Sequence, residues 1–229
     1  ELMEILALGE KGIRELHEMQ REALGEKAAA IAPQRTVVIA SNNQHKIREI
    51  SEMLDDSMQV ISMREAGFTG EIDENGETFE ENAVIKAKAI AEMTQEIVLA
   101  DDSGLEIDYI NKEPGIYSAR YMGEDTSYHI KNQNLIDRLK NAKEEERTAR
   151  FVCAIAAAFP NGEVLTTIGT VEGTIAYEEK GENGFGYDPI FYVPEFGCTT
   201  AELSEEAKNE ISHRGNALRA MKEKLKDKI

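Results

Sequence analysis

Cysteine and histidine are scarce in this sequence: its 229 residues include only Cys153 and Cys198, and four histidines. Neither a disulfide framework nor the ligand spacing of a zinc site can be built from two distant cysteines and no H-x-x-x-H pair. Cys153 lies in the apolar run FVCAIAAAF and is expected to act as a small core residue. The scarcity argues against a zinc enzyme and favours a reducing compartment.

Long apolar runs are also missing. The sequence has no signal peptide and no segment of transmembrane length. We therefore expect a soluble, cytoplasmic protein with no membrane partner. Since the first residue is Glu1, we also expect the start of the gene product to lie upstream.

Positive charge is in short supply, because 26 lysines and arginines face 44 aspartates and glutamates, for a net charge of -18. A nucleic-acid binder needs a broad basic face, so we expect no nucleic-acid partner. A small phosphorylated ligand is still compatible with this charge. It needs only a few lysines, arginines and backbone N–H groups, with a divalent cation held by acidic residues.

The length allows one large domain with an appendage. Residues 1–25 place apolar side chains near helical spacing, although Gly9 and Gly12 weaken a single unbroken helix. A linker ending near Pro33 follows. We expect residues 1–34 to be a helical extension and linker, and residues 35–229 to be the main domain.

From residue 35 onward, candidate strands alternate with helices. Strands are predicted at 58–63, 96–100, 104–110, 149–159 and 163–177, after a first strand and loop within 35–43. Helices are predicted at 45–56, 78–95, 127–142 and 204–229, the last interrupted at Gly215. Asn161-Gly162 is expected to turn a hairpin, and 178–197 to be an ordered loop. This pattern predicts an α/β fold with a long mixed sheet and flanking helices.

The segment ASNNQHK, residues 40–46, connects a predicted strand to a helix. Free N–H groups at a helix start favour an anion, and Ser41, Asn43 and Lys46 could add donors and charge. The alternative is an ordinary asparagine N-cap with a solvated lysine. On this stretch alone the ordinary cap is favoured.

The segment LADDSGLEID places Asp101 and Asp102 at the end of an apolar run, followed by Ser103 and Gly104. Such a pair could hold a divalent metal at a strand end, and an ionised aspartate could take a proton from an attacking water. The alternative is a simple turn, which favours the same residue types. Both interpretations stay open here.

Three further segments carry weaker signals. The acidic loop and helix start EIDENGETFEENA could supply metal ligands, with Lys86 leaning toward a phosphate, but most of its carboxylates also fit a solvated loop. In GFGYD, Phe185 could stack on a base and Asp188 could accept from base or sugar. In KNEISHRG, Arg214 after His213 could fork onto a phosphate or a carbonyl. The alternatives are a packed aromatic turn and an ordinary helix.

Taken together, these segments provide groups for phosphates, for a metal and for a base, which describes a metal-dependent nucleotide hydrolase. In order along residues 36–226, six stretches resemble the inosine/xanthosine triphosphate pyrophosphatase family: SNNQHKIREI, TFEENAVIKAKA, ADDSGLEID, PGIYSARY, GFGYDPIF and AELSEEAKNEISHRG. The resemblance implies two lobes around a cleft on a long mixed sheet, a homodimer, and Mg²⁺-dependent hydrolysis of a nucleoside triphosphate to monophosphate and pyrophosphate.

The resemblance also assigns roles to residues. Asp102 is implied as general base and metal ligand, with Asp101 beside it and Glu74 as a second, less securely aligned ligand. The implied substrate-binding residues are Ser41, Asn42, Asn43, Gln44, His45, Lys46, Lys86, Ser103, Phe185, Gly186, Tyr187, Asp188, Lys208, His213 and Arg214. Donors aimed at a 6-oxo group would disfavour adenine, since its amino group leaves them unpaired.

Two other functions fit the same residues. One is a metal-dependent hydrolase of another nucleotide, such as a modified pyrimidine triphosphate. The other is a nucleotide-binding module without turnover, which would not need a base beside a metal.

The first 34 residues depart from the family. The stretch ILALGEKGIRELHEMQREAL resembles the C-terminal helix of ribonuclease PH. We expect this head to be the remnant of an upstream domain in a fused protein, without ribonuclease activity here. The alternative is a helical extension that packs on the domain or on a neighbouring chain.

Overall fold

The computed structural model describes residues 16, 19, 35–54, 58–226 and 228. Contacts divide the chain into two units, Glu1–Arg35 and Thr36–Ile229. The predicted helix over 1–25, the linker and the resemblance to ribonuclease PH fall almost entirely outside the described residues, and they stay predictions.

A seven-stranded mixed sheet forms the centre of this unit, in the order β2-β1-β3-β4-β5-β6-β7. Its strands are β1 Arg35–Ile39, β2 Met58–Ser62, β3 Ile97–Ile107, β4 Thr148–Ala158, β5 Val164–Ile175, β6 Phe191–Val193 and β7 Cys198–Thr199. β1 runs parallel to β3, whereas the pairs from β3 to β7 are antiparallel. The predicted α/β fold with a long mixed sheet is confirmed.

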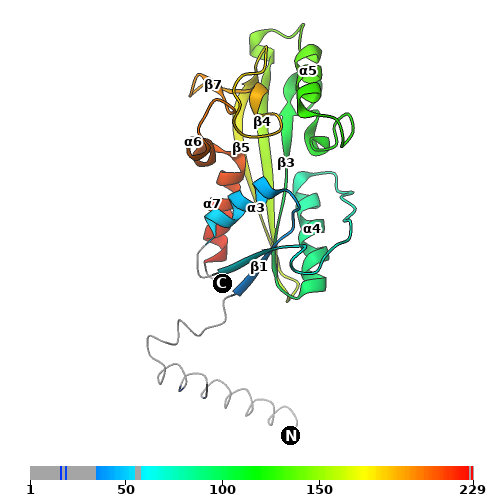
Figure 1. Ribbon diagram of the computed structural model, residues 1–229, viewed down its shortest axis with the longest axis vertical. Coiled ribbons are helices and arrows are strands. Elements are labelled where there is room, and N and C mark those ends of the chain that lie inside the picture. Colours follow the sequence, from blue (N-terminus) through cyan, green and yellow to red (C-terminus); the bar gives the residue numbers. More distant parts are fainter. Residues whose placement is uncertain (1–15, 17–18, 20–34, 55–57, 227, 229) are drawn as a thin grey trace. The chain divides into compact units, whose positions relative to one another are not determined.

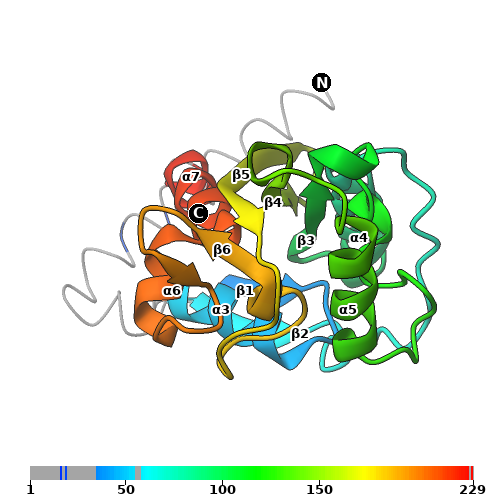
Figure 2. The ribbon, with the colours of Figure 1, turned by 90° about the horizontal axis from the view of Figure 1, so that it is seen from above.

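Helices cover both faces of the sheet. They are α3 Gln44–Met53, α4 Phe79–Thr94, α5 Tyr128–Arg138, α6 Glu205–Ile211 and α7 His213–Leu225. Short 3-10 turns lie at Asp108–Ile110, Gly115–Tyr117, Glu144–Glu146 and Asp188–Ile190. The long strands β3, β4 and β5 separate α4 and α5 from α3, α6 and α7 (Figures 1 and 2).

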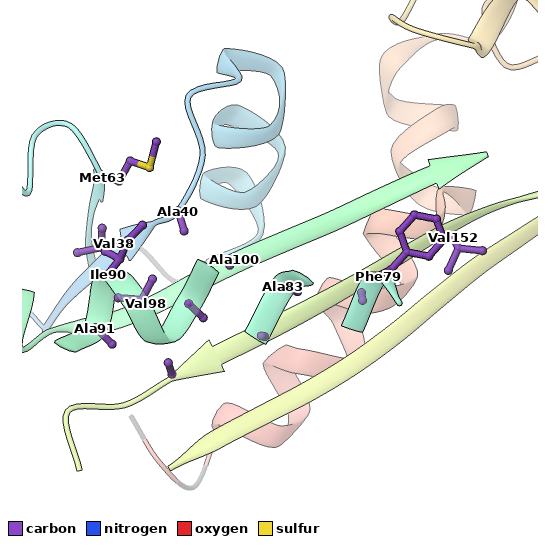
Figure 3. Close-up of a cluster of buried hydrophobic side chains, with 14 residues drawn as sticks. Val38, Ala40, Met63, Phe79, Ala83, Ile90, Ala91, Val98, Ala100 and Val152 are labelled. Carbon is purple, nitrogen blue, oxygen red and sulfur yellow. The ribbon is translucent and has the colours of Figure 1, made fainter. Parts of the chain in front are cut away.

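α4 forms because its apolar residues recur on one face. Phe79, Ala83, Ala87 and Ile90 pack on Val98 and neighbouring residues of the sheet (Figure 3). Small alanines on both sides let the helix approach the sheet closely. Thr78 and Glu81 have the spacing of a capping box. Thr78 caps the helix by accepting from the Glu81 N–H at 3.1 Å, whereas the Glu81 carboxylate accepts from Glu77 N instead of Thr78 N.

The core has three clusters that divide the sheet lengthwise. Two of them sandwich the half of the sheet that contains β1, one under α4 and one under α7 and α3. The third surrounds the other half of β3 and β4, and it joins Leu135 and Leu139 of α5 to Ile190 and Phe191. The long strands thus connect two separately packed ends, as expected for two lobes.

Four predicted features of the chain's local structure differ from the structure. Residues 97–107 form one strand, with no turn at Asp101-Asp102, and the segment 108–110 is a 3-10 turn. The segment 178–197 contains the strand β6 as well as loop. The C-terminal helix breaks at Ser212, not at Gly215. Gly215 lies within α7, and the position requires glycine because a Cβ there would lie 2.3 Å from Asn209 O.

Two other expectations agree with the structure. The hairpin between β4 and β5 turns through Asn161 and Gly162, where Gly162 has φ of +85°. Among the described residues, no helix has the length and apolar character needed to cross a bilayer.

Candidate active site

Asp101 and Asp102 lie in the middle of β3, where this strand loses its neighbour β1. β1 pairs with β3 from Val37 to Ile39, and the last hydrogen bond between these strands joins Ala40 N to Leu99 O at 2.8 Å. Beyond this point β1 turns away into the loop before α3. Since successive side chains of a strand point to opposite faces, the two carboxylates reach different sides of the sheet. Their hydrogen-bond partners show the same division.

Asp101 faces α3 and α7 and is almost fully buried, at 1% exposure. Its Oδ2 lies 2.9 Å from Lys46 Nζ and 3.3 Å from both Nε and Nη2 of Arg214. Burial alone would raise the pKa of Asp101, but Lys46 and Arg214 lower it well below the ordinary range. Asp101 is therefore a charged anchor between two cations.

The guanidinium of Arg214 is surrounded by acceptors of this chain. Nε and one Nη2 hydrogen point to Asp101, the other Nη2 hydrogen to Ser103 Oγ at 3.1 Å, and Nη1 donates to Glu49. Arginine has five N–H donors, so among the described residues one Nη1 hydrogen is left for a ligand. Arg214 is thus held by α3 and β3, with little freedom to move.

Asp102 faces α4 instead. Its Oδ2 accepts from Asn82 Nδ2 at 3.1 Å, and its Oδ1 accepts from Ser103 N at 3.1 Å and lies 3.8 Å from Lys86 Nζ. Lys86 also pairs with Glu74 at 3.0 Å. Burial raises the pKa of Asp102, although Lys86 and Asn82 partly offset that effect. A carboxylate with a raised pKa is a better proton acceptor than an ordinary aspartate.

A groove of about 870 Å³ runs between the loop before α3 and the acidic loop before α4. Asn43 is the N-cap of α3, and its Oδ1 accepts from His45 N at 3.0 Å and Lys46 N at 3.5 Å. Both alternatives drawn from the sequence are thus partly realised: Asn43 is a cap, but Lys46 is paired with Asp101. The predicted residues that line this groove are Ser41, Asn42, Asn43, Lys46, Glu74, Lys86 and Asp101.

A smaller cavity, of about 100 Å³, adjoins the groove at Asn43, Lys46 and Ala119. The predicted residues Ser103, Phe185, Gly186, Tyr187, Asp188, Lys208, His213 and Arg214 line it. The ring of His45 stacks on Phe185, with centroids 5.2 Å apart and planes 19° apart. The predicted residues of the two halves of the chain therefore meet here. Gln44 lies outside, on the exposed first turn of α3.

Asp188 organises the loop that presents Phe185. Its Oδ2 accepts from Phe185 N at 2.8 Å and from Lys208 Nζ at 2.7 Å, and its Oδ1 accepts from Thr200 Oγ1 at 2.8 Å. Gly184 has φ of +75°, and a Cβ there would lie 2.2 Å from Asp188 Oδ2. Both carboxylate oxygens of the buried Asp188 are engaged within the chain, so Asp188 shapes this loop, and its predicted contact with a base stays a prediction.

His213 stacks on Phe151 at the base of the same cavity, with centroids 4.9 Å apart. Burial lowers its pKa well below the ordinary value, and the nearby charges of Arg214 and Lys208 lower it further. His213 is therefore neutral at pH 7. A neutral imidazole carries one donor and one acceptor, which suits the edge of a heterocyclic base.

The model of the Ham1 family matches residues 37–224, nearly the whole of the unit that contains this site. The chain belongs to the Ham1 family. A dITP/XTP pyrophosphatase of Desulforamulus reducens is 51% identical over 191 residues, covering 82% of this chain and 94% of that protein. The corresponding protein of Bacillus subtilis is 47% identical over 192 residues, covering 83% and 97%.

Solved structures of Ham1 proteins have the same fold. The Ham1 protein of Staphylococcus aureus superposes with a TM-score of 0.79 at 46% identity, covering 85% of this chain and 100% of that chain. The Ham1 protein of Coxiella burnetii has a TM-score of 0.79 at 42% identity, covering 84% and 99%.

Two residues of this Ham1 site were missed in the sequence. Asn82 binds Asp102, and Glu49 binds Arg214. Each has a signal in the sequence once the helices are known. Asn82 is four residues before Lys86, so both lie on one side of α4, and Glu49 is three residues after Lys46 on α3.

The carboxylates of this Ham1 site do not form a preassembled metal cage. Among the described residues, no three histidine, cysteine, aspartate or glutamate side chains are close enough to hold a metal by themselves. Glu74 and Asp102 nevertheless converge on one cation, the ammonium of Lys86, which shows that their oxygens favour positive charge between them. Asp101 points to the other face, so its predicted metal role stays a prediction without support from this geometry.

Proposed function

We propose that this chain hydrolyses deaminated purine nucleoside triphosphates, namely ITP, dITP and XTP, to the monophosphate and pyrophosphate, and so removes them from the nucleotide pool. The arrangement on β3 carries the proposal: Asp102, with its raised pKa, lies 3.8 Å from Lys86, which lines the large groove, and the next residue Ser103 lines the small cavity. One strand thus connects space for a triphosphate to space for a base. The names of the dITP/XTP pyrophosphatases to which the chain is similar support the substrate class.

The triphosphate would lie in the groove of about 870 Å³. Ser41, Asn42 and Asn43 form the turn before α3, where backbone N–H groups and the helix start favour an anion. Lys46 and Lys86 approach from two sides, each already oriented by a carboxylate. These contacts hold the phosphate chain with its α-phosphorus near Asp102.

Asp102 would accept the proton of the attacking water as that water adds to the α-phosphorus and pyrophosphate leaves. Asn82 and the Ser103 N–H orient the carboxylate, since they hold one oxygen each. Asp102 and Glu74 would hold Mg²⁺ through their carboxylate oxygens, which are the ligand type that this ion prefers. When bound, Mg²⁺ would offset the charge of the phosphates and lower the pKa of a water.

The base would enter the cavity of about 100 Å³ and stack on Phe185, taking the place of His45 against that ring. The remaining Nη1 hydrogen of Arg214 and the neutral ring of His213 offer donors to a 6-oxo group. An adenine would leave these donors without partners, which is costly in a buried cavity.

We also propose that the protein works as a cytoplasmic homodimer on a free nucleotide, without nucleic acid. The net charge of -18 supports the absence of a nucleic-acid partner.

A substrate panel tests the proposed function. With Mg²⁺ present, we expect fast release of pyrophosphate from ITP, dITP and XTP and at least about 100-fold lower kcat/KM for ATP, because a site built for a hydrogen-bonding group strongly rejects a partner that lacks it. GTP and modified pyrimidine triphosphates complete the panel. Preference for a pyrimidine would assign a different hydrolase. Tight ITP binding without pyrophosphate would leave a binding module.

A second prediction concerns the pH dependence of the reaction. Asp102 must be ionised to act as a base, so activity falls as the pH drops through its raised pKa. Lys86 lowers that pKa by its charge. Replacing Lys86 with methionine therefore raises the pKa of Asp102 and moves the acidic limb of the kcat profile to higher pH. The profile is measured from pH 4 to 9 with ITP.

The matched control is Lys88→Met on the same helix, where the side chain is exposed. It removes the same charge and should leave the acidic limb in place. An unmoved limb in Lys86→Met would contradict the assignment of Asp102 as the titrating base.

A further inference from the structure

Arg120 lines the large groove beside Lys46 and Lys86, but the mechanism above does not use it. Its side chain is exposed, and within the described part of the chain its one recorded contact is with the ring of Tyr117, 4.9 Å from the guanidinium carbon. Lys46 is paired with Asp101 and Lys86 with Glu74. Of these three cations in the groove, Arg120 is therefore the one whose charge is not balanced by a carboxylate.

The backbone that carries Arg120 is held firmly. Ser118 is buried, and its Oγ accepts from Leu105 N at 2.9 Å and donates to Gly115 O at 2.6 Å. Lys131, on α5, donates from Nζ to Ala119 O at 2.8 Å. These bonds tie residues 118 and 119 to β3 and to α5. Arg120 has no ion pair among the described residues, and its backbone is held in place, so its side chain is suited to binding a ligand in the groove.

Lys131 is unusual because it is 1% exposed, although among the described residues no carboxylate pairs with it. Its ammonium lies 4.8 Å from the centre of the Tyr128 ring. A buried cation without a direct ion pair is costly unless its N–H groups are hydrogen-bonded, and Glu124 acts on Lys131 only at longer range. The Lys131 ammonium donates to the carbonyl of Ala119, directly before Arg120, and so holds this carbonyl in place.

The loop of Arg120 is also bound to the loop that presents Phe185. The Tyr187 hydroxyl donates to Ser118 O at 2.6 Å. Tyr187 lies two residues after Phe185, and Ser118 lies two residues before Arg120. This hydrogen bond joins the two loops, so the position of one constrains the position of the other. A base seated against Phe185 would stabilise the position from which Arg120 reaches the phosphates.

We propose that Arg120 leaves the Tyr117 ring and binds the oxygens of the triphosphate, on a loop positioned by Lys131 and Tyr187. This inference rests on the proposed function. The planar guanidinium can donate two parallel N–H bonds to a phosphate, which a lysine cannot do. Its contact with an exposed ring is weak, and no ion pair must be broken before it moves.

The test begins with Arg120→Ala, for which we expect kcat/KM for ITP to fall about 30-fold, as for loss of hydrogen bonds to a charged partner. Arg120→Lys should recover only part of the loss. The inhibition constant of inorganic pyrophosphate should rise at least about tenfold, while that of IMP stays within about twofold. Lys140→Ala removes an equivalent charge from an exposed helix end and should change none of these constants.

The positioning role is tested by Tyr187→Phe and Lys131→Met. Each substitution should lower kcat/KM when made in the wild-type chain. In the Arg120→Ala background each should have little further effect, because Tyr187 and Lys131 act through Arg120. A purely structural role would give additive losses. Unchanged constants in Arg120→Ala, or equal losses for pyrophosphate and IMP, would overturn the inference.

The proposed function can fail separately from this inference. If the wild-type chain releases no pyrophosphate from any triphosphate, calorimetric binding of ITP to Asp102→Asn and to Asp102→Asn/Arg120→Ala still decides the matter. Weaker binding by the double variant supports Arg120 as a phosphate ligand. Equal affinity, or no binding by either variant, overturns it.

Discussion

Asp102→Asn is expected to lower kcat for ITP by about 1,000-fold, within the range that general bases contribute, while ITP binding changes little. The amide has nearly the size of the carboxylate, and its one oxygen can still accept from Asn82, so of the two bonds that hold Asp102 only the one from Ser103 N–H is lost. What it cannot do is take a proton from water. Single-turnover pyrophosphate release measures the chemical step, and calorimetry measures binding.

The control for this variant is Asp125→Asn, which removes the same charge from an exposed loop and should keep full activity. A titration with Mg²⁺ separates two roles of Asp102. If the carboxylate served only as a metal ligand, high Mg²⁺ would restore the rate of Asp102→Asn, whereas a missing base cannot be restored in this way. A variant that retains the wild-type rate at ordinary Mg²⁺ would contradict both roles.

Asp101→Asn is expected to reduce the free energy of unfolding by about 3 kcal/mol, because removing one partner leaves buried cations uncompensated. Lys46 and Arg214 both depend on this carboxylate, which is 1% exposed. For a chain of this size, about 3 kcal/mol corresponds to a decrease in Tm of about 10 °C. Thermal unfolding followed by circular dichroism measures the change.

The pH dependence of this effect has a defined sign. Lys46 and Arg214 hold the pKa of Asp101 below its unfolded value of about 3.9 against the opposing effect of burial. Its ionised form therefore stabilises the fold above that value, and the benefit is lost as the pH falls below it. The difference in stability between wild type and Asp101→Asn should be constant near neutrality and shrink below about pH 4.

Asp108→Asn is the matched control for stability. Asp108 also contacts an arginine, Arg150, but the two side chains are 34% and 20% exposed, and pairs that solvent reaches contribute about 0–1 kcal/mol. A loss in Asp108→Asn equal to that in Asp101→Asn would show that burial between two cations is not the cause.

The sequence predicted those elements whose signals are local. α4 begins at its Thr78 cap, α5 follows its Ser127 cap, and the hairpin turns at Asn161 and Gly162. In each case the residues that decide the structure are neighbours in the chain. The predicted residues of the site also gather around two adjoining cavities, because motifs at the ends of β1, in β3 and at the start of α7 meet on one sheet.

The path of β3 could not be predicted in this way. Asp, Ser and Gly are favoured in turns, so DDSG indicates a turn when only neighbours are considered. The strand continues because Arg214, 113 residues further along the chain, and Lys46 compensate Asp101. Glu49 likewise fixes the position of Arg214. This contact joins α3 to α7, and a pattern of neighbouring residues cannot predict it.

Asp101 and Asp102 point to opposite faces of the sheet, and this limits where residues can be inserted into or deleted from the chain. β3 pairs with β4 residue by residue from Val98 to Ile107, so no loop can absorb an inserted or deleted residue there. A shift of β3 by one residue would exchange the faces to which its side chains point. Ala100 or Asp102 would then take the place of Asp101 between Lys46 and Arg214. A substitution in this strand changes one side chain, whereas an insertion or deletion would change the facing of the residues beyond it, so insertions and deletions should be confined to segments such as the hairpin turn at 159–163.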